Sequence, residues 1–236
     1  MDYGELNKKD VNNLISKIVD HIINKEVPDS EISASVRNVM NIWEWESGVA
    51  LFALYLFYRE TKDKNLLNFI INWFESRIQS NNIPTKNVNS MCPLLTLSFI
   101  YEETGEEKYL DLCKEWLAYA MKQMPRTEEE GIQHIVVNKR NEGQLWDDTL
   151  YMTILFISRM GIILDEDNYI QESIRQFLIH LKYLTDTKTG LLFHGWSFID
   201  KNHFAGALWG RGNAWFSAAL VDYLEMVTLP KGVEWF

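Results

Sequence analysis

The sequence repeats itself at an offset of 43 residues, and this periodicity limits the folds open to the chain more than any other feature. Each copy predicts a helix, a tight turn and a second helix. Repeated helical hairpins of this length build either an open solenoid or a closed α/α toroid. A weaker third copy runs through Gly161, Tyr169 and Ile170. The aligned positions of the two clear copies are Tyr58, Glu60, Thr61, Leu67 and Trp73 with Tyr101, Glu103, Thr104, Leu110 and Trp116.

Apolar residues recur at three- and four-residue spacing in stretches 11–23, 66–78, 109–124 and 169–184, as is typical of amphipathic helices. Gly105 after Thr104 indicates a helix end, and Pro93 suits a first helical turn. Strand-like alternation is nearly absent. The sequence therefore predicts an all-α fold of about eight helices in a single domain over residues 1–236.

Three predicted connections, 83–90, 125–144 and 185–210, are long and contain His134, His194, His203 and several aromatic residues. A solenoid that serves only as a scaffold keeps its turns short. Long loops that carry such residues at one end of successive hairpins favour a toroid with a site at its mouth.

Composition excludes several classes of protein. The net charge is −10 and no dense stripe of Lys and Arg is present, so nucleic acid is not an expected partner. The longest apolar run, 48–57, is shorter than the ~20 residues that cross a bilayer, so no membrane partner is expected. The first residues do not resemble a secretory signal, and we expect a cytoplasmic location.

Both cysteines, Cys92 and Cys113, lie inside apolar helical patterns. Such cysteines are usually buried reduced thiols. We therefore expect no disulfide framework and no zinc site, and the chain needs no cofactor for the chemistry considered below.

The segment from Gln144 to Met152 leads a polar loop into an apolar helix and contains two adjacent carboxyl groups, Asp147 and Asp148. One Asp would suffice to cap that helix. Since consecutive helical positions differ by about 100°, we expect one Asp to cap while the other faces inward beside Trp146. An aromatic setting that excludes water raises a carboxyl pKa, whereas a helix N-terminus lowers it, and the sequence leaves that balance open.

Two further segments carry candidate ligand-binding groups: His194 in a loop, and Arg211 between Gly210 and Gly212. Glycines at these positions let the backbone approach a ligand and leave the guanidinium uncrowded. Arg211 then suits bidentate recognition of a carboxylate.

Three motifs resemble those of the unsaturated glucuronyl and rhamnogalacturonyl hydrolases, glycoside hydrolase family 105 and the related family 88. They are W-x-D-[ST]-L-[FY]-M from Trp146, H-G-W from His194 and W-x-R-G-N-x-W from Trp209. The resemblance also covers 43–49 and 87–95 and extends to Trp215, nearly the whole chain. It implies an (α/α)6 toroid and a hydrolase that releases the Δ4,5-unsaturated uronic acid from the non-reducing end of oligosaccharides left by polysaccharide lyases.

The resemblance also implies roles for individual residues. Asp148 matches the acid that protonates C4 of the double bond, after which water adds at C5 and the hemiketal collapses to release the sugar. Arg211 is expected near the uronate, with tryptophan rings stacking on the sugar. The expected substrate-binding residues are Trp43, Trp45, Asn87, Asn89, His134, Trp146, His194, Trp209, Arg211 and Trp215.

The chain departs from the family in two respects. Asn87 and Asn89 stand where many relatives carry a second Asp, and an amide can position a substrate or a water but cannot act as a base. The toroid needs twelve helices, so we expect an incomplete ring that lacks its last hairpins. A homo-oligomer could cover the open edge.

Two alternatives stay open. Another α/α-toroid sugar enzyme, such as an epimerase or an inverting glycosidase, would need a second group facing Asp148, for which His134 and Glu142 are candidates. A non-catalytic helical-repeat protein that binds a carbohydrate or a partner is favoured by the asparagines and the missing hairpins.

Overall fold

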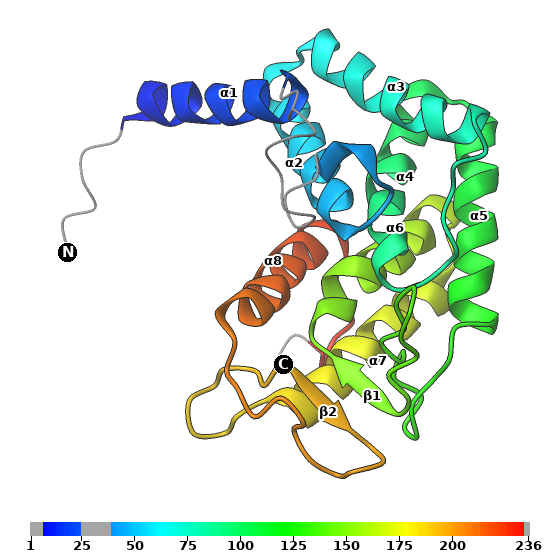
Figure 1. The fold of residues 1–236 in the computed structure, drawn as a ribbon, viewed down its shortest axis with the longest axis vertical. Helices are drawn as coiled ribbons and strands as arrows, with labels where there is room; N and C mark the ends of the chain where they lie inside the picture. Colours follow the sequence, from blue (N-terminus) through cyan, green and yellow to red (C-terminus); the bar gives the residue numbers. More distant parts are fainter. Residues whose placement is uncertain (1–6, 25–38, 234–236) are drawn as a thin grey trace. The chain divides into compact units, whose positions relative to one another are not determined.

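The computed structural model describes residues 7–24 and 39–233. The chain divides into two compact units, Met1–Ile83 and Pro84–Phe236. The prediction of one domain over 1–236 stays a prediction, because the arrangement of the two units is not determined (Figure 1).

The first unit contains α1 (Lys8–Asn24), a 3-10 turn (Val39–Asn41), α2 (Trp45–Thr61) and α3 (Lys64–Gln79). Helices α2 and α3 pack as a hairpin, shown in blue to cyan in Figure 1. Their facing apolar side chains are excluded from water, including Leu51, Leu54, Ile70 and Phe74. Burial of these side chains is the main favourable contribution to this pairing.

The second unit is built around α6, which packs against four other helices, α4, α5, α7 and α8. All seven residues from Leu155 to Gly161 are buried, so this part of α6 is enclosed on every side. The elements in chain order are a 3-10 turn η2 (Asn89–Met91), α4 (Cys92–Thr104), α5 (Glu107–Lys122), β1 (Gln144–Trp146), a π-helical turn η3 (Leu150–Ile154), α6 (Leu155–Leu164), α7 (Asp167–Leu184), β2 (Gly195–Ser197) and α8 (Gly210–Met226).

The predicted helical hairpins are confirmed, and they share one type of turn. Helices α2, α4 and α6 each end at a residue in the left-handed conformation: Lys62 (φ 56°), Gly105 (φ 71°) and Asp165 (φ 53°). In the two clear copies of the repeat, the hydroxyls of Thr61 and Thr104 donate to the carbonyl four residues earlier. The aligned threonines therefore help to close the last turn of each helix.

A short antiparallel sheet joins two of the long connections, and the sequence pattern did not predict it. Trp146 of β1 lies opposite Gly195 of β2. Figure 1 shows the two strands side by side, next to α7. Leu145 of β1 is buried against Ile179 and Phe198. Strands of three residues are too short to display the alternation by which strands are recognised in a sequence.

Both cysteines are buried and unbridged, as predicted. Burial raises the pKa of the Cys113 thiol far above its ordinary value, which keeps it protonated. Among the described helices, none combines the length and the apolar character that a membrane span requires.

The shared turn allows a test of backbone strain. Lys62 and Lys64 both place their ammonium groups over the Tyr58 ring, at 5.5 and 5.8 Å, but only Lys62 has a positive φ. Lys62→Gly should raise the free energy of unfolding by about 0.5–1 kcal/mol, because glycine has no Cβ to strain. Lys64→Gly, which loses the same ring contact from a helical position, should lower it. Urea unfolding measures the free energy of unfolding of both variants. An equal loss of stability in the two would contradict the interpretation that the positive φ of Lys62 strains the backbone.

Candidate active site

Asp147 and His194 face each other where the β1–β2 ladder continues one residue beyond the sheet. The Asp147 N–H donates to the His194 carbonyl at 3.1 Å. Their side chains meet as well, with His194 Nδ1 2.8 Å from Asp147 Oδ1. The Asp147 side chain is 0% exposed. Strand pairing therefore holds an acid and a base together although they are 47 residues apart in the chain.

Asp148 lies beside this pair and is the more accessible acid. Its Oδ2 is 3.4 Å from the same nitrogen of His194, and its side chain is 17% exposed. The helical residues begin at Asp148 and pass into the π-helical turn η3, and both carboxyl groups turn toward His194. The expectation that one Asp caps the helix stays a prediction. A π-helical turn frequently marks a functional site.

Burial sets the protonation of the two acids. It raises the pKa of Asp148 to about 7, and the hydrogen bond with Asp147 and the charge of Asp147 add to this effect. Burial also raises the pKa of Asp147 to about 6, but there the hydrogen bond with Asp148 opposes the rise. Desolvation thus outweighs the helix end, a balance the sequence left open, and Asp148 holds its proton more tightly than Asp147.

Trp146 is the centre of a group of rings next to the acids. His134 stacks on it at 4.5 Å with an interplanar angle of 6°, and His194 meets it edge-on at 4.7 Å. His134 Nδ1 lies 3.1 Å from the hydroxyl of Thr149. Because burial lowers the pKa of His134 to about 3, this ring is neutral near pH 7.

Trp209 and Arg211 lie on the other side of His194. The Trp209 ring meets His194 edge-on at 4.6 Å, and the Arg211 guanidinium lies over Trp209, 4.0 Å from the ring centroid. Burial lowers the pKa of His194; the charge of Asp148 opposes this effect and that of Arg211 adds to it. Trp215, one turn further along α8, packs against Tyr151 at 5.3 Å.

Gly212 has a role that sequence reasoning missed. A Cβ on Gly212 would lie 2.1 Å from Asp147 Oδ2, whereas one on Gly210 would meet no atom within 4 Å. The first turn of α8 therefore closes directly on the Asp147 carboxyl group. The two glycines were interpreted as giving space to Arg211, and no signal in a single sequence distinguishes that reading from contact with a distant carboxylate.

The Asn87 side chain forms hydrogen bonds with the backbone of nearby residues. Its Oδ1 accepts hydrogen bonds from the N–H groups of Asn89 (2.9 Å) and Ser90 (3.2 Å), and its Nδ2 donates to the Thr85 carbonyl (3.0 Å). The residue is buried. These contacts start the turn that leads into α4, so the expected contact of Asn87 with substrate stays a prediction. Asn89 is partly buried in the same turn.

The two expected tryptophans of the first unit differ in exposure. Trp43 is buried against Trp73 at 5.4 Å and Phe74 at 5.6 Å, as part of the core of that unit. Trp45, at the start of α2, is partly buried. Their roles toward a sugar stay predictions.

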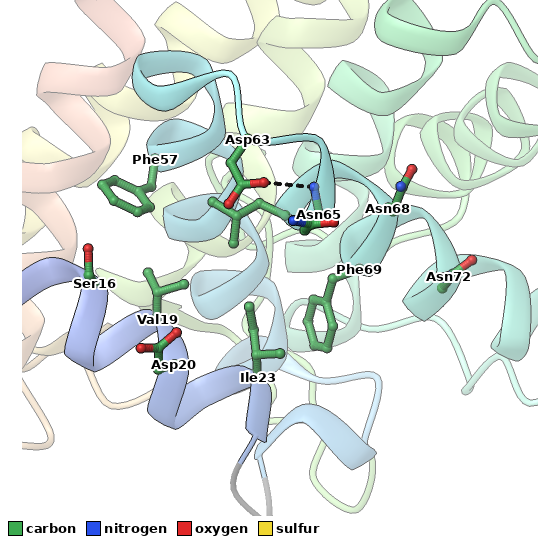
Figure 2. A pocket seen from close by; sticks show the side chains of 11 residues that line it. Ser16, Val19, Asp20, Ile23, Phe57, Asp63, Asn65, Asn68, Phe69 and Asn72 are labelled. Atoms are coloured by element: carbon green, nitrogen blue, oxygen red, sulfur yellow. Dashed lines mark hydrogen bonds between the residues drawn. The ribbon is translucent and has the colours of Figure 1, made fainter.

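The lining of a hollow in the first unit includes none of the predicted site residues (Figure 2). It is lined by residues of α1, such as Val19 and Asp20, by Phe57 of α2 and by polar residues of α3. Asp63 at its edge accepts a hydrogen bond from the Asn65 N–H and caps α3. Its two carboxylates, without a lining Lys, Arg or His, make it an unsuitable site for a uronate.

Asp147, Asp148 and His194 could also hold a cation, since each offers one ligand atom and these atoms lie within 4.8 Å of one another. A cation ligand must first lose its proton. Burial opposes the ionisation of both acids, so binding of a cation would have to overcome this cost.

Comparison with known proteins identifies relatives along most of the chain. The family model described as Glycosyl Hydrolase Family 88 matches residues 14–234. The unsaturated rhamnogalacturonyl hydrolase YesR of Bacillus subtilis (strain 168) is 29% identical over 211 residues, which are 87% of this chain and 61% of that protein.

Two solved structures are similar throughout. Both are described as possible members of the GH105 family. The one from Salmonella enterica serovar Paratyphi A is 37% identical with a TM-score of 0.89, covering 99% of this chain and 64% of that one. The one from Klebsiella pneumoniae is 37% identical with a TM-score of 0.88, covering 97% and 61%. The chain thus spans a little over three fifths of the length of these relatives. The similarity confirms the predicted class, an all-α fold of the α/α toroid type, and the chain belongs to glycosyl hydrolase family 88.

Proposed function

We propose that this chain carries the catalytic acid of a hydrolase that releases a Δ4,5-unsaturated uronic acid from the non-reducing end of lyase-generated oligosaccharides of the rhamnogalacturonan type. The observation that carries the proposal is the state of Asp148. This carboxyl group is partly exposed beside His194, whose ring meets Trp146 edge-on, and its pKa is raised to about 7. The substrate class rests on the similarity to a rhamnogalacturonyl hydrolase.

Hydration of the double bond needs an acid that is still protonated near neutral pH, and a buried carboxyl group meets this requirement. Asp148 gives its proton to C4 of the sugar as a C–H bond forms. Water then adds at C5 and returns a proton to Asp148. The C5 hemiketal opens and the bond to the neighbouring sugar breaks, so the reaction consumes one water and leaves the acid as it began.

The uronate needs a local cation, because the chain as a whole carries a net charge of −10. Arg211 is exposed, and its guanidinium stacks on Trp209. A guanidinium stacked on an aromatic ring suits recognition of a carboxylate through its planar fork of N–H groups. The partly exposed rings of Trp146 and Trp209 flank His194 and offer apolar surface to the sugar.

The geometry disfavours an inverting glycosidase, whose two carboxyl groups stand about 6.5–9.5 Å apart with a water between them. One oxygen of Asp147 and one of Asp148 lie within 4.8 Å of each other, which is closer than that spacing. Glu142 is 70% exposed at its side chain and faces Arg140 at 4.0 Å. His134 is stacked on Trp146 and neutral, so neither alternative partner is placed as a second acid or base.

Turnover of an unsaturated galacturonosyl-rhamnose disaccharide tests the proposal. The purified chain should remove the ultraviolet absorbance of the double bond, and Asp148→Asn should slow this by about 10²–10⁴-fold, the usual contribution of a general acid. The saturated disaccharide should remain intact. Cleavage of the saturated sugar, or undiminished turnover by the variant, would exclude the proposed mechanism, and binding without turnover would support the non-catalytic alternative.

Arg211→Gln should raise KM by about 10–100-fold with a smaller change in kcat, because one charge-assisted contact to the substrate carboxylate is lost. Arg140→Gln is the matched control, since Arg140 is 76% exposed and loosely paired with Glu142. Steady-state kinetics on the free acid and its methyl ester measure the effect. The ester should show little difference between wild type and Arg211→Gln; an equal loss on both substrates would argue against contact with the carboxylate.

The rate should fall as pH rises through about 7, because the protonated form of Asp148 is the active one and its pKa is raised to about 7. Without burial, an aspartic acid would lose its proton near pH 4 and the fall would occur there. A profile of kcat/KM between pH 5 and 9 measures the midpoint. A rate that increases through pH 7 would instead indicate a deprotonated base.

A further inference from the structure

The proposed reaction uses one acid, yet the chain buries a second carboxyl group beside it. Asp147 is 0% exposed, bonded to His194 through Oδ1 and tied to the His194 carbonyl through its own N–H. A buried carboxyl group is costly unless its polar atoms are paired. Burial of Asp147 therefore lowers the stability of the fold, which points to a functional role for this residue.

The surroundings of Asp147 determine its partners. Gly212 closes on Oδ2 so tightly that any Cβ would collide with it at 2.1 Å. Oδ1 is occupied by His194 Nδ1 at 2.8 Å. Asp147 Oδ2 and Asp148 Oδ2 are both buried and have no other hydrogen-bond partner, and one oxygen of each acid lies within 4.8 Å of the other. A hydrogen bond between the two side chains would satisfy them and would raise the pKa of Asp148 while lowering that of Asp147. Two adjacent carboxyl groups can make such a bond only while one of them is protonated.

The charges around the pair decide which acid holds the proton. Asp148 faces Asp147 and His194, and Arg211 from α8 acts on His194 from the other side. His134, across Trp146, is neutral. Asp147 receives the His194 N–H, which favours its anion, whereas Asp148 lies next to that anion, which favours its acid form.

We propose that Asp147 is a positioning residue for the proposed reaction, with its buried carboxylate accepting one hydrogen bond from His194 Nδ1 and one from the carboxyl group of Asp148. This inference rests on the proposed function of Asp148. Asp147 orients Asp148 and keeps it protonated. It also fixes the His194 tautomer, which leaves Nε2 as a hydrogen-bond acceptor for a sugar hydroxyl or a water. Gly212 contributes to this arrangement, since a residue without a side chain leaves room for the Asp147 carboxylate.

Titration of Asp148 itself tests the proposal without any substrate. In protein labelled with ¹³C at the Asp carboxyl carbons, the Asp148 signal is identified by its loss in Asp148→Asn. In Asp147→Asn its midpoint should move down by about one pH unit or more, because the anion that opposes its ionisation is gone. The asparagine oxygen still accepts from His194, so the fold is retained, and circular dichroism confirms this. An unchanged midpoint would overturn the proposal.

Glycine variants give an independent route to the same measurement. Gly212→Ala should displace the Asp147 carboxyl group and shift the Asp148 midpoint, while Gly210→Ala, in the same turn of α8, should leave it unchanged. If both variants shift the midpoint equally, the contact with Gly212 is not what holds Asp147.

Kinetics separates positioning from mere support of the fold. In Asp147→Asn the alkaline limb of the pH–rate profile should move down with the Asp148 midpoint, so kcat falls at pH 8 far more than at pH 5, and KM stays within a few-fold. Asp222→Asn is the control, because Asp222 of α8 also has a pKa raised to about 6 by burial. A uniform loss at every pH would contradict positioning. If wild type consumes no unsaturated disaccharide while the NMR midpoint still shifts, the proposed function fails and the Asp147 contact stands.

Discussion

The arrangement of the candidate site depends on the antiparallel pairing of β1 with β2. Three residues on each side join connections that are otherwise far apart in the chain. The ladder continues by one hydrogen bond from Asp147 to His194, and that bond places a carboxyl group and an imidazole on the same face. A shift of one residue in the pairing would put Asp147 and His194 on opposite faces of the ladder, and their side chains would no longer meet. The buried cluster around Leu145 helps to keep the observed register.

Several features of the site lower the stability of the fold and serve the proposed function. Burial raises the pKa of two carboxyl groups, and a helix backbone approaches one of them so closely that only glycine fits. Each of these features costs free energy in isolation. Together they leave a proton on Asp148, whose side chain is partly exposed and lies next to His194.

Much of the fold could be predicted because helices of 16 to 18 residues carry enough periodicity to be recognised. The four stretches identified from spacing coincide with α1, α3, α5 and α7, except that one extends two residues past the end of α5, and the aligned threonines close equivalent turns. The site was predicted unevenly. His134, Trp146, Asp148, His194, Trp209 and Arg211 do lie in one continuous series of contacts. The shared contact of both aspartates with His194 and the backbone contacts of Asn87 were not anticipated.

The sequence by itself determined the helical hairpins and the residue types available to the site, because periodicity, turn residues and motifs are local properties of the chain. Only the tertiary structure decided the proton affinity of the two aspartates, the contact between Gly212 and Asp147 and the strand register that brings His194 to them. These properties depend on distance and on exclusion of water between segments remote in sequence, and no local pattern records either.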